Sequence, residues 1–235
     1  VTWQPAFRLV DTSTVTPDPE IAALVKAYED KLDQELNVVI GRSETPLDSR
    51  RATVRGTEAA IGNLIADAIR ASVSADIAIT NGGGIRADRE YAAGSEITRK
   101  DVFSELPFGN KTTKLELTGA QIRAALENGF SQIEATAGRF PQISGMTVKV
   151  DANKPAGSRV LSVAVGGMPL DDAKTYAVAT NDFMTAGGDG YTVFRDGRTV
   201  ISGADGKLMA SDVIDFIAAA GTVSPKVEGR IVIDR

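Results

Sequence analysis

The sequence of 235 residues contains no histidine and no cysteine. Histidine is the usual proton carrier near neutral pH and the commonest ligand of transition metals, so its absence excludes most histidine-based acid-base mechanisms and most transition-metal centres. The absence of cysteine excludes disulfides, thiol nucleophiles and thiolate metal sites, and cysteine pairing cannot indicate a cellular compartment. The chain is therefore better equipped to bind a ligand than to transform one.

Long apolar runs and an excess of positive charge are also lacking. No apolar run approaches the roughly 20 residues that a helix needs to cross a bilayer. The net charge of −5 argues against binding a nucleic-acid polymer through many phosphate contacts. The start at Val1, without an initiator methionine or an apolar signal core, indicates a mature or trimmed chain. With 43% hydrophobic and 24% charged residues, the composition is that of a globular protein with a substantial core.

Periodicity and capping residues divide the chain into a tail and one domain. Residues 1–17 have little periodicity and are typical of a linker or of the tail of a preceding domain. From Asp18 onward, an N-cap residue, a proline at the first helical position and apolar residues at helical spacing predict a long helix over 18–37. No second linker and no internal repeat follows, so residues 18–235 are predicted to form one α+β domain.

Helices and strands alternate along this predicted domain. In its first half we expect a helix with an apolar stripe from Ile61 to Val73, a strand over 76–80, a short helix from Thr98 to Glu105, a strand over 114–117 and a helix from Thr118 to Phe130. In its second half we expect strands at 146–150, 160–165, 176–180 and 230–234, and a helix over 207–219 that buries Leu208, Val213, Phe216 and Ile217. The spacing of the strands over 146–180 predicts an antiparallel meander.

A glycine loop and a pair of arginines are candidates for binding an anion. Three consecutive glycines follow the strand over 76–80, in Asn81-Gly-Gly-Gly-Ile-Arg86. Glycine permits positive φ angles and a close approach of the backbone to a ligand, and Arg86 can donate two hydrogen bonds to a phosphate. Arg51 and Arg55 are four residues apart and can face the same direction. A tight turn with a solvated arginine, and a solvated basic edge, are the structural alternatives.

Two aromatic residues stand in loops where burial is awkward. Phe108 lies between proline and glycine, and a ring held on a rigid loop suits stacking on a flat base. Asn110 follows two residues later and can read the donor and acceptor edges of such a base. Phe183 opens a second glycine-rich segment, over 183–190. For each ring, folding down onto the core is the alternative.

Asp189 lies between two glycines of the second segment. A carboxylate in this position can accept hydrogen bonds from both hydroxyls of a ribose. Calcium is the competing ligand, but one carboxylate with few neighbouring oxygens falls short of the roughly six to eight ligands that calcium takes. The structural alternative is an aspartate that stabilises a turn.

Five segments occur in an order that resembles a known family. They contain Ile61-Gly-Asn-Leu-Ile-Ala-Asp67, Asn81-Gly-Gly-Gly-Ile-Arg86, Leu106-Pro-Phe-Gly-Asn110, Gly138-Arg-Phe-Pro-Gln-Ile-Ser-Gly145 and Gly187-Gly-Asp-Gly-Tyr191. Together they resemble the C-terminal domain of the 5'-nucleotidase family, which includes UDP-sugar hydrolases and 2',3'-cyclic-nucleotide phosphodiesterases. The resemblance runs from about Arg51 to Tyr191. It implies an α+β substrate-specificity domain of layered helices with mixed or antiparallel sheets.

The resemblance also implies a role for each candidate residue. A nucleotide base would be clamped between two aromatic rings, and the phosphate and the ribose would be held by charged side chains. The rings would be Phe108 and Phe183, the phosphate ligands Arg51, Arg55 and Arg86, the contacts to the base Asn81, Asn110 and the backbone near Gly138, and the ribose carboxylate Asp189. Gly83 would also belong to the substrate-binding residues.

Hydrolysis in this family takes place in a separate N-terminal metallophosphoesterase domain. Its two divalent metal ions are held by aspartate, asparagine and histidine residues in characteristic motifs, and none of these motifs is present here. The resemblance thus implies a chain with no cofactor of its own and no catalytic residues, which binds a nucleotide or nucleoside and partners a metal-bearing domain of the same polypeptide through the helix over 18–37. It further implies a periplasmic, cell-surface or secreted location.

Two other hypotheses belong to different classes. A freestanding nucleotide-binding or cell-surface adhesion module would keep the same fold without a catalytic partner. A metal-free hydrolase would need Asp189 or Glu58 as a base, although neither has a visible partner in the sequence.

Overall fold

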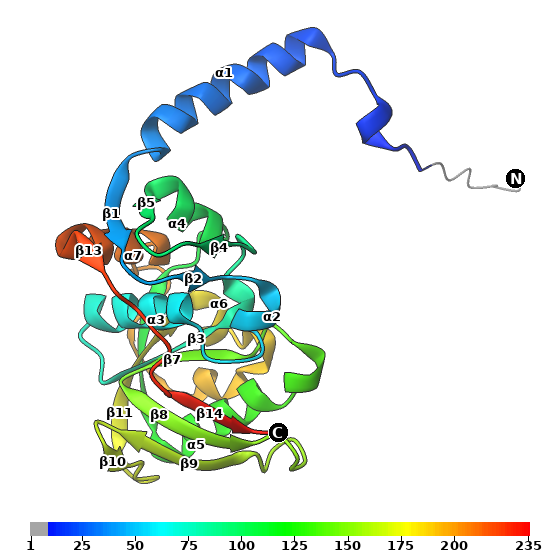
Figure 1. The fold of residues 1–235 in the computed structure, drawn as a ribbon. Helices are drawn as coiled ribbons and strands as arrows, with labels where there is room; N and C mark the ends of the chain where they lie inside the picture. The colour runs from blue at the N-terminus through cyan, green and yellow to red at the C-terminus, as the bar shows by residue number, and fades with distance from the viewer. Residues whose placement is uncertain (1–8) are drawn as a thin grey trace, which may run out of the picture. The chain divides into compact units, whose positions relative to one another are not determined.

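The computed structural model describes residues 9–235, and contacts between residues divide it at Val38 and Val39 (Figure 1). Ahead of this division lie a short 3-10 turn, η1 (Thr12–Thr14), and helix α1 (Pro19–Leu36). The Asp18 carboxylate accepts hydrogen bonds from the backbone N–H groups of the first turn, which confirms the helix predicted over 18–37. Of the predicted linker, residues 1–8 lie outside the described chain and residues 9–17 are exposed.

The apolar residues of α1 do not belong to a core. The helix contains no buried residue. The apolar residues at helical spacing are exposed: Ile21, Leu24, Val25, Tyr28 and Leu32. The compact unit begins at Val39, so the predicted domain start at residue 18 includes a helix that this unit does not contain.

A five-stranded mixed sheet is the centre of the compact unit. Only its β11 and β3 strands are parallel neighbours, and the other three pairings are antiparallel. The order across the sheet is β12 (Arg198–Ile201), β6 (Thr112–Thr118), β11 (Thr175–Asn181), β3 (Ile77–Asn81) and β7 (Pro141–Ser144). All five residues of β3 are buried, because this strand is covered on both faces.

Three smaller sheets surround the central one in the described chain. The largest has the order β10 (Met168–Pro169), β9 (Val160–Val165), β8 (Met146–Asp151) and β14 (Ile231–Asp234). The others join β13 (Thr222–Val223), β1 (Val39–Ser43) and β5 (Glu96–Thr98), and β2 (Leu47–Asp48) with β4 (Glu90–Tyr91).

Hydrophobic clusters cover the two faces of the central sheet. Alternate residues of β3 enter different clusters, with Ala78 in one and Ile77 and Ile79 in the other. The first cluster contains side chains of α3 (Ala60–Ser72), α4 (Arg99–Glu105) and α7 (Met209–Ala220), and the second those of α5 (Gly119–Phe130), β8 and β9. Figure 1 shows α4 and α7 toward one end of the compact unit and β8, β9 and α5 toward the other. The structure therefore has the layered α+β architecture that the sequence predicts.

Helix starts follow the local signals closely. Thr98 and Thr118 each close a capping box, in which the threonine side chain accepts from a backbone N–H and a side chain at the third helical position accepts from the threonine N–H. These boxes begin α4 and α5 at the predicted positions. Their side-chain partners are Asp101 and Gln121.

The predicted meander over 146–180 is wrong at its last strand. Strands β8, β9 and β10 pair in sequence, but β11 leaves them and inserts between β6 and β3 of the central sheet. Most residues of β11 are buried, as a central strand requires. The spacing of strand signals along the sequence contains no information about which strands pair.

The prediction that Leu208 is buried in the last helix is also wrong. Leu208 precedes α7 as its N-cap residue and is 39% exposed.

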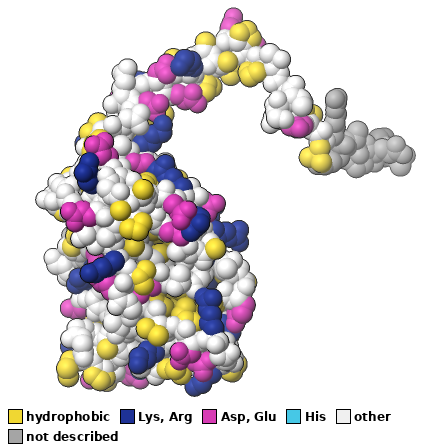
Figure 2. All heavy atoms as spheres, viewed as in Figure 1, with side chains coloured by type: hydrophobic (Ala, Val, Ile, Leu, Met, Phe, Trp, Pro, Cys, Tyr) yellow, Lys and Arg dark blue, Asp and Glu magenta, His cyan; other side chains and the backbone are white. Residues whose placement is uncertain are grey.

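The charges on the compact unit are mixed. On the face in view in Figure 2, lysine and arginine side chains are interspersed with aspartate and glutamate. This face offers no single-sign basic patch of the kind that follows a nucleic-acid backbone.

Candidate functional site

The candidate site lies where the two parallel strands β3 and β11 end. Each strand ends in asparagine, and the Nδ2 of Asn181 donates to the Oδ1 of Asn81 at 3.2 Å. Asn81 is followed by a 3-10 turn, η2 (Gly82–Gly84), and Asn181 caps the short helix α6 (Asp182–Thr185) by accepting from the N–H of Met184. Loops beyond the carboxyl ends of neighbouring parallel strands are a common place for a ligand.

A cavity of about 400 Å³ opens between these loops. We refer to it as the main cavity, and its size is within the range of roughly 300–1,000 Å³ of small-molecule sites. Nine of the ten residues predicted from the sequence line it, together with Gly84: Arg55, Asn81, Gly83, Arg86, Phe108, Asn110, Gly138, Phe183 and Asp189. The tenth, Arg51, lines an adjoining cavity of about 240 Å³, the arginine cavity, which shares Arg55 and Arg86 with the main cavity.

The two phenylalanines are exposed walls of the main cavity. Phe108 is 58% exposed and Phe183 is 44% exposed, and neither belongs to a core cluster. The ring of Phe183 lies against Gly188, where an added Cβ would come within 2.5 Å of the ring carbons. The guanidinium carbon of Arg86 is 5.3 Å from the centre of the Phe108 ring. The alternative that these rings fold down onto the core is therefore wrong.

Two of the three glycines after β3 are required for a reason other than a positive φ angle. None of Gly82, Gly83 and Gly84 has a positive φ angle. Instead, a Cβ at Gly82 would overlap the carbonyl oxygen of Val54, and a Cβ at Gly83 would lie 2.8 Å from the Cα of Gly138. The close approach is to the chain's own backbone, and it brings Arg55, next to Val54, and Gly138 to the edge of the cavity.

Three arginines bring positive charge to one place. Arg51 begins the single-turn helix α2 (Arg51–Val54), and Arg55 ends it, so the two are one helical turn apart. Within residues 9–235, the guanidinium groups of Arg51, Arg55 and Arg86 donate no side-chain hydrogen bond and form no ion pair, and the Nε of Arg55 is buried without a partner. Burial, followed by the charges of Arg51 and Arg86, lowers the pKa of Arg55. An anion at this position would offset that unfavourable clustering.

Asp189 is held by two asparagines and keeps one oxygen available. Its backbone is left-handed, with φ 53°, inside the 3-10 turn η4 (Gly188–Gly190). The Nδ2 of Asn81 donates to its Oδ2 at 2.7 Å, and the Nδ2 of Asn128 donates to its backbone carbonyl at 3.1 Å. In the described chain no donor reaches Oδ1. The buried Asn81 amide, predicted to contact a base, therefore already orients this carboxylate.

Glu105 is a neighbouring residue that the sequence analysis missed. It is buried at the end of α4, and its carboxylate accepts from the hydroxyl of Tyr91 at 2.8 Å and from the N–H of Ala87 at 3.2 Å. Its backbone carbonyl accepts from the N–H of Arg86. Burial raises the pKa of Glu105. Glu105 therefore connects Arg86, after the glycine loop, to the start of the loop that carries Phe108.

Glu58 does not take part in the site. Its buried carboxylate accepts hydrogen bonds from the Asn63 amide at 2.6 Å and from the backbone N–H groups of Glu228 and Ile231 at 2.7 and 3.2 Å. These hydrogen bonds join α3 to the last strand and occupy the Glu58 carboxylate, so it is no candidate for a catalytic base.

In residues 9–235 no three acidic, cysteine or histidine side chains gather as a metal-binding group. In the same range no helix is both long and apolar enough to cross a membrane.

Comparisons with known proteins agree with the motif order. Residues 39–196 match the family described as the 5'-nucleotidase C-terminal domain, and this match begins where the compact unit begins. The chain is 37% identical over 225 residues to the trifunctional nucleotide phosphoesterase protein YfkN of Bacillus subtilis, covering 91% of this chain and 15% of that protein. It is 31% identical over 238 residues to snake venom 5'-nucleotidase of Naja atra, covering 93% of this chain and 45% of that protein.

A solved structure shows the same fold. The 5'-nucleotidase precursor from Thermus thermophilus superposes with a TM-score of 0.82 at 39% sequence identity, over 92% of this chain and 43% of that chain. The present chain spans less than half the length of each of these three proteins. With a family match over most of its compact unit, the chain belongs to the 5'-nucleotidase C-terminal domain family.

Proposed function

We propose that this chain is the substrate-recognition part of a 5'-nucleotidase-type phosphohydrolase and that the main cavity binds a nucleoside or a nucleotide. One observation carries the proposal: exposed rings, unpaired guanidinium groups and an oriented carboxylate converge on a single cavity. A nucleotide carries a flat base, a diol and an anion, and these are the three groups that such side chains recognise. Family membership supports the same reading.

In this proposal the base stacks between Phe108 and Phe183. Stacking on an aromatic side chain contributes roughly 1–3 kcal/mol per base. Gly188 supports one face of the Phe183 ring, which leaves the other face for the base. Asn110 and the backbone at Gly83 and Gly138 would contact the base edge, and the lining of one cavity by all three supports this assignment.

The ribose and the phosphate would contact different side chains of the cavity wall. The Oδ1 of Asp189 is the acceptor for ribose hydroxyls, because Oδ2 is already bonded to Asn81. Arg55 and Arg86 are the phosphate ligands shared by the two cavities, and Arg51 adds a third guanidinium group from the arginine cavity. The buried, unpartnered Nε of Arg55 supports this assignment.

We further propose that the hydrolytic step belongs to a metal-bearing domain outside these 235 residues. In that domain two divalent metal ions would polarise the phosphate and supply hydroxide. The present chain would bind nucleotides without hydrolysing them, as a partner of that domain in the same polypeptide. Because one relative is a snake venom 5'-nucleotidase, a periplasmic, cell-surface or secreted location is proposed as well.

A freestanding nucleotide-binding or adhesion module is the second candidate. It is favoured by the position of the main cavity, whose lining residues all belong to one compact unit, Val39–Arg235. Phosphate release decides between catalysis and binding alone. Steady release of phosphate from AMP by the 235-residue chain, with or without added divalent metal, would contradict the binding role in both candidates.

Calorimetric titration with adenosine and AMP tests the proposed function. Replacing Phe108 or Phe183 by alanine is expected to weaken both ligands by about tenfold, since each removes one stacking surface. Replacing Met168, an exposed residue at the far sheet, by alanine is the matched control and leaves both affinities unchanged. Equal heats for the wild type and both phenylalanine variants would exclude the stacking arrangement.

A further inference from the structure

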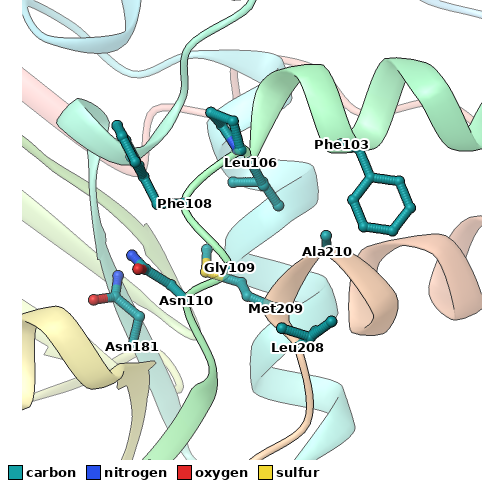
Figure 3. Close-up of a pocket in the computed structure, with 11 residues that line it drawn as sticks. Phe103, Leu106, Phe108, Gly109, Asn110, Asn181, Leu208, Met209 and Ala210 are labelled. Atoms are coloured by element: carbon teal, nitrogen blue, oxygen red, sulfur yellow. The ribbon is translucent and has the colours of Figure 1, made fainter. Parts of the chain in front are cut away.

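A smaller cavity of about 110 Å³ adjoins the main cavity. We call it the apolar cavity (Figure 3), and it shares Gly84, Phe108 and Asn110 with the main cavity. Figure 3 shows Phe108, Asn110 and Asn181 on one side and Phe103 and Ala210 on the other. The space therefore continues the main cavity past the Phe108 loop, toward α4 and the start of α7.

Most of the wall of the apolar cavity is hydrocarbon. Phe103 and Leu106 come from α4 and its C-cap, and Leu208, Met209 and Ala210 come from the start of α7. Leu208 is 39% exposed although a leucine gains from burial, and it stands at the rim of this space. Nothing in the proposed recognition of base, ribose or phosphate makes use of these side chains.

The only free polar side chain of the described wall stands at the junction of the two cavities. The Asn181 amide is occupied, because its Nδ2 donates to Asn81 and its Oδ1 accepts from Met184. The backbone carbonyl of Asn110 is also occupied, by the N–H of Met209 at 2.9 Å. The side-chain amide of Asn110 makes no hydrogen bond within residues 9–235. It stands between the main cavity on one side and the hydrocarbon wall of the apolar cavity on the other.

The size of the apolar cavity limits what it can hold. An apolar cavity of roughly 150 Å³ accommodates benzene, so a space of 110 Å³ fits a group of about five carbon atoms. Such a group must reach the cavity from a ligand already in the main cavity, and the shared residue Asn110 marks the crossing point. A base whose exocyclic nitrogen hydrogen-bonds to Asn110 would direct a substituent on that nitrogen into the apolar cavity.

We propose that the apolar cavity is a subsite for a small alkyl substituent on the exocyclic nitrogen of the bound base. The ligand class is the N-alkylated nucleosides and nucleotides. This inference rests on the proposed function, because it places the base in the main cavity next to Asn110. It goes beyond that function by assigning a specificity role to Phe103, Leu208 and Ala210, which do not touch the proposed nucleotide.

Calorimetry on the 235-residue chain tests the subsite with three nucleosides. Adenosine is the reference, N6-cyclopentyladenosine carries five carbons on the exocyclic nitrogen, and 8-cyclopentylaminoadenosine carries the same group on another edge. The N6-substituted compound is expected to bind at least about tenfold tighter than adenosine, because it buries its ring methylenes in a preformed apolar space. The 8-substituted compound is expected to bind no tighter than adenosine.

Variants that change only the apolar cavity locate this gain. Ala210→Leu fills the space and is expected to abolish the advantage of the N6-cyclopentyl group, while adenosine binding stays unchanged because Ala210 does not line the main cavity. Leu208→Ala, at a partly exposed position, removes one wall and should reduce the same advantage several-fold even if the buried Ala210 variant does not fold. Circular dichroism confirms that each variant is folded.

The outcomes separate the two proposals. If adenosine binds and the N6-cyclopentyl group brings no gain, the subsite is refuted while nucleoside binding stands. The same holds if the 8-substituted compound gains equally, since the effect would then be general hydrophobicity. If neither adenosine nor AMP binds, the proposed function is refuted, and the subsite with it.

Discussion

The two glycine-rich loops of the site use glycine in different ways. In the loop after β3, Gly82 and Gly83 have negative φ angles. Glycine is needed there because Val54 and Gly138 leave no room for a Cβ atom. In the loop after β11, Gly187 and Gly190 have φ angles of 86° and 83°, and Gly188 lies flat against the Phe183 ring. Glycine in the first loop allows backbone segments to pack closely, and glycine in the second allows left-handed turns beside the Phe183 ring. Similar composition therefore conceals two separate physical requirements.

The largest expected effect breaks the packing of the first loop. Gly82→Ala places a Cβ on the carbonyl oxygen of Val54, a backbone atom that cannot move aside easily. We expect a loss of about 3 kcal/mol in the free energy of unfolding, measured by urea denaturation. Gly84→Ala is the matched control in the same turn, because its Cβ would meet the Asn81 side chain at an acceptable 3.4 Å. Equal stability of the two variants would contradict the close-approach explanation.

The second prediction tests the carboxylate of the second loop. Asp189→Asn keeps a residue that tolerates the left-handed backbone but removes the negative charge. Hydrogen bonds to a charged group are worth roughly 1.5–3 kcal/mol, so adenosine should bind about tenfold or more weakly by calorimetry. The affinity for 2',3'-dideoxyadenosine, which lacks both hydroxyls, should not change. A similar loss for both nucleosides would show that Asp189 supports the loop rather than the ribose.

The third prediction concerns the replacement of Gly188, in the second loop, by alanine. Gly188→Ala pushes against the Phe183 ring, whose side chain can swing away, so the protein should keep its stability but lose support for the stacking ring. We expect adenosine to bind about fivefold more weakly, a fraction of one stacking contribution. On a Phe183→Ala background the substitution should have no further effect on affinity. An additive loss in the double variant would mean that Gly188 acts independently of the ring.

The smallest expected effect concerns Glu105, which accepts hydrogen bonds from the backbone N–H groups of Arg86 and Ala87 after the first loop. Burial raises its pKa in the folded state above that in the unfolded state, so the folded protein binds this proton more tightly. Stability from this group therefore rises as the pH falls through the raised pKa toward the unfolded value, and it decreases as the pH rises. Unfolding of the wild type and Glu105→Gln, compared at pH 5 and pH 7.5, should show the wild type gaining relative stability at pH 5. A constant difference would contradict the shift.

Much of the secondary structure could be predicted because its signals are local. The Asp18-Pro19 start of α1 and the threonine capping boxes of α4 and α5 act within one helical turn. The pairing of β11 with β3 could not be predicted, because it joins residues about a hundred positions apart through burial on both faces. The same holds for Leu208: a helical period cannot show that the helix begins only after it, at the rim of a cavity.

The residues of the candidate site were predicted from the order of motifs, while their geometry was not. Nothing in the residue types shows that Asn81 is bonded to Asp189 or that Gly83 rests on Gly138. Asn181 and Glu105 were missed, although one signal was available: both parallel strands end in asparagine at the edge where the loops begin. Their roles depend on contacts across the fold.

Composition and short-range pattern establish an α+β chain without histidine or cysteine, the starts of its helices, and loops that carry arginine, phenylalanine and aspartate. These follow from side-chain chemistry and from interactions within a few residues. The fold decides that the loops meet in one cavity, that glycine allows close backbone packing in one of them and left-handed turns beside the Phe183 ring in the other, and that hydrocarbon space lies beyond Asn110. Those properties come from the burial of β3 and β11 between two hydrophobic clusters, which no local segment encodes.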